Sequence, residues 1–380
     1  MAKRISGAGL KVAIIERGRF GGTCVNTGCI PTKTLVASAY AAHMARRAVE
    51  YGVALHGPVS VNMKQVKARK DLISGQSSTG VETWLRKMAN CTVLQGHARF
   101  ESEREVTVGD VRIAAERIFI NVGGRAAVPE IPGLAEIKYL TNSSMMEIDF
   151  LPRHLIIVGG GYVALEFAQM YRRFGSEVTI LQSAPRVIAN EDEDVSSAVR
   201  GILENEGIEI RVNADCKRVK KSDDGVIVSI GCDGKFTEVH GSHLLLAAGR
   251  RPNTDDLGLE RAGIHSDSRG YITVNDELMT NVPGIWALGD CNGRGAFTHT
   301  SYNDFEIVAA NLFENDHLRV SDRIMAYALY IDPPLGRAGM TEEQARKSTG
   351  QIMVAQRPMT SCEKTPSRAE IGRASCRERV

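Results

Sequence analysis

The stretch Leu155–Leu181 reads LIIVGGGYVALEFAQMYRRFGSEVTIL, and it decides the fold. An apolar strand leads into a turn in which Gly159, Gly161 and Ala164 have G-x-G-x-x-A spacing, and a helix and a second apolar strand follow. The glycines let the backbone approach a pyrophosphate, which then lies at the N-terminus of the helix. This complete strand–turn–helix–strand order predicts a dinucleotide-binding unit.

A second, incomplete copy of this unit opens the chain. Aligning Gly175 with Gly9 places Glu177–Gln182 on Lys11–Glu16, so the opening segment corresponds to the second half of such a unit. The first strand and its glycine turn would precede this sequence. Residues 3–9 would then be the tail of the lost helix, ending at a glycine as helices often do. We therefore expect the chain to be a fragment at its N-terminus.

Two cysteines follow this opening strand. Cys24 and Cys29 are five positions apart, which on a regular helix means about 7.5 Å along the axis. A disulfide needs Cα atoms about 4.4–6.8 Å apart, so the oxidised segment must be locally distorted, and Gly28 supplies backbone freedom for it. When the pair is reduced, the start of the helix predicted over Thr32–Arg47 and the Lys33 cation favour thiolate.

The spacing indicates a redox disulfide. A structural zinc site or a buried-thiol pair is the alternative, but zinc sites usually have closer cysteines and a second pair. The remaining cysteines are scattered, which is typical of a reducing cytoplasm. They are Cys91, Cys216, Cys232, Cys291, Cys362 and Cys376.

Composition excludes several function classes. The formal net charge of +2 over 380 residues favours neither nucleic acid nor a membrane surface. The sequence has neither a transmembrane-length apolar run nor a signal-peptide pattern, and its histidines lack ligand spacing, so we expect a cytoplasmic protein without a metal site. The acidic run Glu191–Asp194 is expected to cap a helix start and stay solvated.

The last ten residues, 371–380, read IGRASCRERV. This is the translation of a common short-read sequencing adapter. We expect the tail to be an assembly artefact and leave it out of the fold.

Further segments follow in a recognisable order. They are IFINVGGR at 118–125, AGRRPN at 248–253, IWALGD at 285–290, and ALYIDPP at 328–334 followed by GMTE at 339–342. With the cysteine run and the glycine turn, residues 2–360 resemble the class I pyridine nucleotide–disulfide oxidoreductases, the family that includes dihydrolipoamide dehydrogenase, glutathione reductase and mercuric reductase.

The resemblance implies an α/β fold with two Rossmann-like dinucleotide-binding domains, for FAD and NAD(P), and a partial α+β interface domain. The implied bounds are 1–151 and 271–322 for the FAD domain, 152–270 for the NAD(P) domain and 323–370 for the start of a truncated dimerisation domain. The full-length parent would be a homodimer whose partner supplies an acid/base histidine from beyond the end of this sequence.

The resemblance also implies residue roles. Cys29 would lie next to the flavin, Cys24 would exchange with substrate, and Lys33 would lie at the reactive flavin edge, paired with Glu166. Tyr162 would cover the nicotinamide face of the flavin. The implied catalytic residues are Cys24, Cys29, Lys33 and Glu166. Glu16 would bind the adenosine ribose of FAD, and Asp290 would bind its ribityl chain. With these two, the implied cofactor-binding residues are Glu16, Gly22, Thr23, Lys33, Gly123, Gly159, Gly161, Tyr162, Ala164, Gln182, Arg186, Gly249, Arg250, Asp290 and Thr298.

One departure bears on the nicotinamide nucleotide. Gln182 stands where an NAD site would place an acid for the ribose 2′-hydroxyl, and Arg186 is close enough in sequence to bind a 2′-phosphate. The pattern therefore favours NADPH over NADH.

The implied reaction passes electrons from NAD(P)H through FAD and the disulfide to a small-molecule or metal-ion acceptor, as in mercuric reductase-like or orphan enzymes. Dihydrolipoamide dehydrogenase is the enzymatic alternative. From other classes, the alternatives are a non-catalytic fragment that only binds nicotinamide nucleotide, and a dithiol metal-binding protein without flavin.

Overall fold

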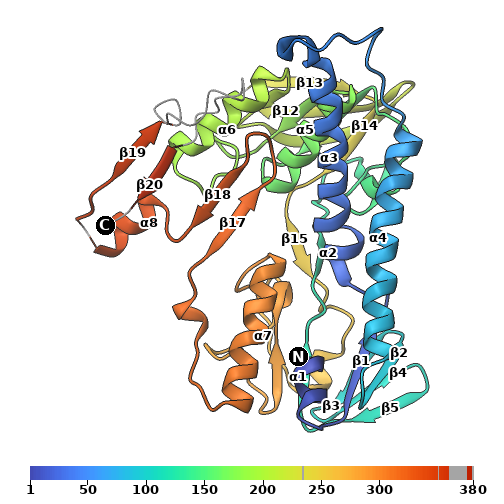
Figure 1. The fold of residues 1–380 in the computed structure, drawn as a ribbon, viewed down its shortest axis with the longest axis vertical. Coiled ribbons are helices and arrows are strands. Elements are labelled where there is room, and N and C mark those ends of the chain that lie inside the picture. The colour runs from blue at the N-terminus through green and yellow to red at the C-terminus, as the bar shows by residue number, and fades with distance from the viewer. Residues whose placement is uncertain (233–234, 350, 359–374, 379–380) are drawn as a thin grey trace. The chain divides into compact units, whose positions relative to one another are not determined.

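The computed structural model describes residues 1–232, 235–349, 351–358 and 375–378 (Figure 1). The helices are α1 (Ala2–Gly7), α2 (Gly22–Asn26), α3 (Cys29–Arg46), α4 (Met63–Arg86), α5 (Tyr162–Phe174), α6 (Glu193–Asn205), α7 (Thr298–Phe313) and α8 (Glu342–Thr349). The strands are β1 (Val12–Glu16), β2 (Cys91–Gln95), β3 (Ala98–Ser102), β4 (Glu105–Val108), β5 (Val111–Ala114), β6 (Ile118–Ile120), β7 (Gly124–Ala126), β8 (His154–Val158), β9 (Glu177–Leu181), β10 (Glu209–Arg211), β11 (Asp215–Ser222), β12 (Gly225–Cys232), β13 (Lys235–Gly241), β14 (His243–Leu246), β15 (Arg250–Pro252), β16 (Ile285–Ala287), β17 (Ala326–Leu329), β18 (Leu335–Ala338), β19 (Ala355–Pro358) and β20 (Ser375–Glu378).

The chain divides into two compact units. Unit 1 comprises Met1–Thr32, Lys70–Ala126 and Arg250–Arg323, and unit 2 comprises Lys33–Arg69, Ala127–Gly249 and Ile324–Val380. The domain bounds expected from the sequence stay predictions. Of the expected adapter tail, residues 371–374, 379 and 380 lie outside the described residues.

Unit 2 is built on a parallel sheet of four strands in the order β10–β9–β8–β14. This order, third, second, first and then a later strand, is that of a Rossmann fold. Along β8 successive side chains face opposite sides of the sheet. Leu155 and Ile157 pack in one core with α5 and α6, whereas Ile156 and Val158 pack in another with β11–β13. The predicted strand–turn–helix–strand unit is therefore confirmed.

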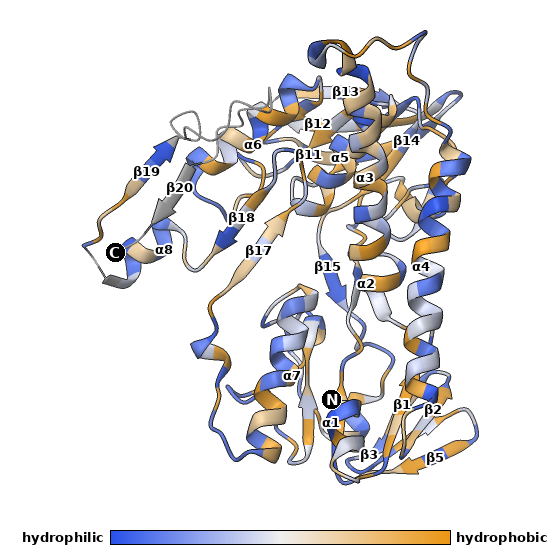
Figure 2. Ribbon diagram, viewed as in Figure 1, coloured by the Kyte–Doolittle hydropathy of each residue, from blue (hydrophilic) through white to orange (hydrophobic). Residues whose placement is uncertain are grey.

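Unit 1 contains two parallel strand pairs, β1–β2 and β6–β16, and the antiparallel sheet β3–β4–β5. Its core includes Trp286 of β16, which stacks on Phe119 of β6 at a centroid distance of 5.2 Å, together with Ile307 and Val308 of α7. Figure 2 shows β1 as hydrophobic and β15 as hydrophilic. The helix predicted over residues 3–9 is confirmed as α1, but it ends at Gly7, two residues before the predicted Gly9, whose φ is +76°.

Two local predictions need correction, the start of helix α3 and the solvation of the acidic run Glu191–Asp194. Helix α3 begins at Cys29, three residues before the predicted Thr32, because Gly28 already accepts the Thr32 backbone N–H at 2.9 Å.

The fold class is confirmed. Within the described residues, no helix is both long and apolar enough to cross a membrane.

The prediction for the acidic run Glu191–Asp194 is confirmed in its second half and wrong in its first. Helix α6 begins at Glu193, and Glu193 and Asp194 are exposed. Glu191, in contrast, is 4% exposed, accepts a hydrogen bond from the Tyr327 hydroxyl and pairs with Arg337. Asp192 accepts the backbone N–H groups of Glu342 and Glu343, at 2.9 and 3.2 Å, so its side chain caps α8. These partners are more than 130 residues away along the chain, where a local charge pattern carries no information.

Candidate active site

The two cysteines lie on separate helices. Helix α2 ends at Asn26 and α3 begins at Cys29, so Cys24 and Cys29 do not share one regular helix. The distortion expected of the oxidised segment stays a prediction, because both thiols are reduced. A Cβ atom on Gly28 would lie 2.9 Å from the carbonyl oxygen of Thr23. Glycine is therefore needed at this break because two backbone segments approach closely.

Both thiols are reduced and share hydrogen-bond partners. Cys24 and Cys29 hydrogen-bond to each other, and the Thr298 hydroxyl contacts both sulfurs, lying 3.4 Å from Cys29 Sγ. Thr298 is the first residue of α7. Cys29 is exposed and Cys24 is half-buried. The arrangement gives a pair of thiols that can close to a disulfide beside one hydroxyl.

The pKa of the Cys24 thiol is raised above its ordinary value, first by its hydrogen bond with Cys29 and then by burial. The expectation that helix and cation would favour thiolate is therefore wrong for Cys24. The residue lies in short helix α2, so the dipole of α3 does not begin at it.

Lys33, whose side chain is 34% exposed, forms an ion pair with the buried carboxylate of Glu166. Its Nζ lies 2.9 Å from Oε1 and 2.8 Å from Oε2, while the Glu166 side chain is only 5% exposed. The Tyr330 backbone N–H donates to Oε1 at 3.0 Å, and the Lys33 ammonium lies 4.3 Å from the centre of the Tyr330 ring. The pairing predicted from the resemblance is confirmed, and Tyr330 joins it.

The glycine turn after β8 has the geometry that a bound pyrophosphate needs. Gly159 has φ +115°, and a Cβ there would lie 2.3 Å from the Ala247 carbonyl oxygen. Gly161 precedes the first turn of α5, and a Cβ there would meet no described heavy atom within 4 Å. Ala164 is fully buried, and Tyr162 packs against the core of unit 2. The turn therefore leaves room at the helix N-terminus.

At the carboxyl end of β9, the Gln182 side chain lies against the same turn. A Cβ on Gly160 would come within 2.9 Å of it. The Gln182 amide donates to the Arg186 carbonyl oxygen at 3.3 Å, and Ile188 donates its N–H to the Gly160 carbonyl at 2.7 Å, so this loop is fixed to the turn. Arg186 Nε is buried and has no hydrogen-bond partner among the described residues.

Several of the residues expected at the flavin lie in unit 1, whereas Lys33 and Tyr162 belong to unit 2. Asp290 belongs to a short 3-10 turn, Gly289–Asn292, and its carboxylate lies 3.5 Å from Arg250 Nε. Burial raises the pKa of Asp290, and Arg250 counteracts this. Glu16 ends β1 and accepts the Gly18 N–H at 2.7 Å.

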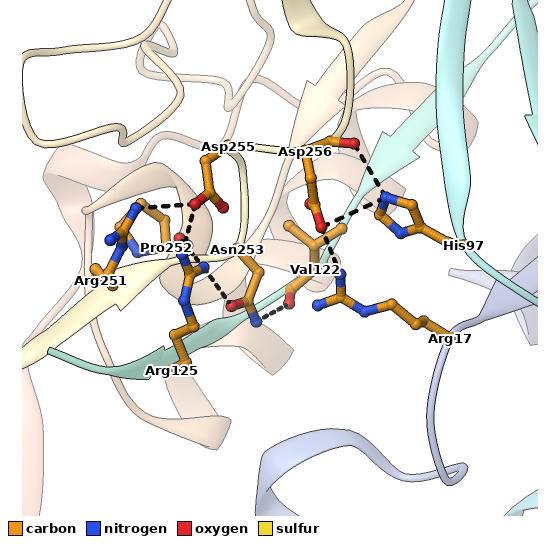
Figure 3. A network of polar contacts seen from close by, with 9 residues as sticks. All are labelled: Arg17, His97, Val122, Arg125, Arg251, Pro252, Asn253, Asp255 and Asp256. Carbon is orange, nitrogen blue, oxygen red and sulfur yellow. Dashed lines mark hydrogen bonds and ion pairs between the residues drawn. The ribbon is translucent and has the colours of Figure 1, made fainter. Parts of the chain in front are cut away.

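Strand β15 and the residues after it are anchored to neighbouring elements of unit 1 by charged and amide side chains (Figure 3). Asn253 donates to the Val122 carbonyl at 3.0 Å, and Asp255 lies between Arg125 and Arg251. These contacts fix the turn around Gly123, whose φ is +65°.

Residues 1–304 match the family described as pyridine nucleotide-disulphide oxidoreductase. The chain belongs to this family. It is 35% identical to the probable pyridine nucleotide-disulfide oxidoreductase RclA of Escherichia coli over 95% of this chain and 79% of that protein. It is 33% identical to the mercuric reductase of Streptomyces lividans over 88% of this chain and 72% of that protein. A solved structure of the HOCl-induced flavoprotein disulfide reductase RclA matches with a TM-score of 0.87 at 33% identity, covering 100% of this chain and 83% of that one.

Members of this oxidoreductase family depend on FAD and use NAD(P)H. The residues present fit both cofactors. For the nicotinamide nucleotide, the turn at Gly161 is open and Arg186 Nε is unpartnered among the described residues. For FAD, Gly22 and Gly123 both have positive φ and, within the described residues, space where a Cβ would be. Gly249, at φ +118°, is likewise open toward described atoms.

Two residues of this oxidoreductase were missed by the sequence reasoning. Tyr330 contacts Glu166 through its backbone N–H, which leaves no signature in the sequence. Asp304 is fully buried and accepts the Gly289 N–H at 2.7 Å, so it anchors the turn that holds Asp290. A carboxylate among the buried apolar residues of α7 is the signal that could have found it.

Proposed function

We propose that the chain passes electrons from NADPH, through FAD and the Cys24–Cys29 pair, to a soft metal ion such as Hg(II). The observation that carries this proposal is the pair of mutually hydrogen-bonded thiols, both of which contact the Thr298 hydroxyl. Thiolates are ligands that soft metal ions prefer. The similarity to mercuric reductase supports the same acceptor class.

The thiol chemistry balances within the pair. Reducing the disulfide breaks the S–S bond and takes up two electrons and two protons, and both leave when the acceptor is reduced and the bond re-forms. FAD, when bound, supplies two-electron exchange between NADPH and the disulfide. We assign Cys29 to the flavin side and Cys24 to the acceptor side. The Thr298 hydroxyl, which contacts both sulfurs, stabilises whichever one carries negative charge.

Two residues of unit 2, Lys33 and Tyr162, would act directly at the flavin. We assign Lys33 to the reactive edge of the flavin, where its cation favours the reduced ring, and Glu166 holds that cation in place. Tyr162, the first residue of α5, would cover the nicotinamide face of the flavin until the nucleotide displaces it.

The preference for NADPH has its own test. Arg186 supplies a cation beside Gln182, with Nε buried and unpartnered among the described atoms. Losing a charge-assisted hydrogen bond to a 2′-phosphate costs about 1.5–3 kcal/mol. Arg186→Ala should therefore lower kcat/KM for NADPH about 10- to 100-fold and leave that for NADH nearly unchanged. Equal losses with both nucleotides would contradict the assignment.

The experiment for the whole function uses the expressed 380-residue chain. We expect flavin absorbance near equimolar occupancy, bleaching by NADPH, and re-oxidation by Hg(II). Cys24→Ser and Cys29→Ser should each abolish NADPH-dependent Hg(II) reduction. Cys91→Ser, which changes a half-buried thiol of β2, is the matched control and should retain it.

Other outcomes would favour the alternatives. Re-oxidation by lipoamide and not by Hg(II) would identify a dihydrolipoamide dehydrogenase. A colourless protein that binds NADPH would indicate a fragment that retains only nicotinamide-nucleotide binding.

A further inference from the structure

Helix α5 carries three buried polar side chains on one face. Glu166, Gln169 and Arg173 are spaced by three and four residues, and they are 4%, 4% and 6% exposed. All three contact the segment Tyr330–Asp332, which follows β17. Buried polar groups are costly unless they are hydrogen-bonded, so these contacts hold the helix face and the segment together.

Gln169 binds the segment in the manner of a neighbouring strand. Its Oε1 accepts the Asp332 backbone N–H at 2.8 Å, and its Nε2 donates to the Asp332 carbonyl oxygen at 2.9 Å. The same Nε2 lies 2.8 Å from Glu206 Oε1. One amide therefore satisfies both backbone groups of one residue.

Arg173 and Glu206 fix that amide in turn. Arg173 makes two hydrogen bonds to Glu206, at 2.8 and 2.7 Å, and lies 2.9 Å from Asp332 Oδ2. With a 5% exposed side chain, Arg173 has little freedom to leave this arrangement. The segment is consequently tied to α5 through both its backbone and its carboxylate.

The segment also supplies two of the contacts around the Lys33–Glu166 pair. Tyr330, two residues before Asp332, donates its backbone N–H to Glu166 and places its ring against the Lys33 ammonium. The N–H that Tyr330 donates to Glu166 is a backbone group, so its position depends on how Gln169 holds the backbone at Asp332. A shift of Asp332 moves the donor to Glu166.

We propose that Gln169 is a positioning residue for the Lys33–Glu166 ion pair, acting through Asp332 and Tyr330. Without the Gln169 amide, both backbone groups of Asp332 lose their partner, the segment moves, and Lys33 becomes more mobile. The inference that this matters for the reaction rests on the proposed role of Lys33 at the flavin. The mobility of the Lys33 side chain can be measured whether or not Lys33 serves the flavin.

The test measures acylation of Lys33 by a water-soluble N-hydroxysuccinimide acetate, quantified by peptide mass spectrometry against exposed Lys64 of α4. Gln169→Leu should raise the Lys33 rate, normalised to Lys64, by about five- to tenfold, the factor that corresponds to loss of a net hydrogen bond. Glu166→Gln removes the charge that holds the Lys33 ammonium, so it gives the acylation rate of a released Lys33. Gln65→Leu, an exposed helical glutamine, is the matched control and should leave the rate unchanged.

A second variant keeps the test usable if Gln169→Leu does not fold. Gln169→Glu retains the acceptor for the Asp332 N–H but loses the donor to its carbonyl, so we expect an intermediate rate. An unchanged Lys33 rate in a folded Gln169 variant, with a raised rate in Glu166→Gln, would overturn the proposal.

The flavin-bound chain separates this inference from the proposed function. If Lys33 serves the flavin, the flavin reduction potential should fall in Gln169→Leu and in Lys33→Met, which removes the cation. A raised acylation rate in Gln169→Leu with an unmoved potential in both variants would support the placement and defeat the role of Lys33. A potential that falls only in Lys33→Met would support the role and defeat the part of Gln169.

Discussion

Asp304 offers the sharpest test of how the turn Gly289–Asn292 is held. Its carboxylate is 0% exposed, accepts the Gly289 N–H at 2.7 Å and the Asn292 amide at 3.0 Å, and pairs with Arg323. The Arg323 side chain is only 7% exposed. Removing one partner of such a buried pair costs about 3–5 kcal/mol, because the remaining charge stays uncompensated. We therefore expect Asp304→Ala to lower the free energy of unfolding by about 4 kcal/mol.

The assay is urea unfolding of the flavin-free chain followed by tryptophan fluorescence. Both tryptophans lie in unit 1, and Trp286 is a core residue, so the signal reports on this unit. Asp256→Ala is the matched control, because this carboxylate is 42% exposed and pairs with Arg17 and His97, as Figure 3 shows. An exposed pair contributes at most about 1 kcal/mol.

A double-mutant cycle distinguishes the ion pair from simple packing. Asp304→Asn combined with Arg323→Met leaves no lone charge, so its cost should be smaller than the sum of the single costs by about 2 kcal/mol or more. A cost of Asp304→Ala no larger than that of Asp256→Ala would refute the reasoning, as would strict additivity in the cycle.

Two further predictions concern the break between the two cysteines and the turn at Asp290. Gly28→Ala should cost about 1–3 kcal/mol, since its Cβ would lie 2.9 Å from the Thr23 carbonyl, and should slow disulfide formation measured by thiol titration. Gly80→Ala in α4, whose Cβ would meet no described atom within 4 Å, should instead stabilise by about 0.5–1 kcal/mol, and equal effects at both positions would argue against close packing. For Asp290, a raised pKa means that the folded state loses stability as pH rises above the ordinary aspartate value of about 3.9. Asp290→Asn should therefore become progressively more stable than the unmodified flavin-free chain between about pH 3 and 7 in urea unfolding, and a pH-independent difference would count against burial as the cause.

The sequence alone predicted the elements whose causes are local. The glycine turn at Gly159, the strand predicted over Lys11–Glu16 and the break between Cys24 and Cys29 each follow from a few neighbouring residues, through backbone sterics, a short apolar run and helix rise. These features were enough to predict the fold class and the redox chemistry. Even the pairing of Lys33 with Glu166 followed from motif positions in a recognised family.

Tertiary structure decided the partners of buried polar groups. The burial of Glu191, the contact of Thr298 with both thiols, and the hold of Gln169 on Asp332 join residues more than 130 positions apart, so local periodicity does not encode them. Even the need for glycine at position 28 was predicted for the wrong reason. The sequence indicated backbone freedom, whereas the structure shows that the space beside it is taken by the Thr23 carbonyl. Local sequence thus determined which elements form and which chemistry they carry, and packing determined which atoms meet.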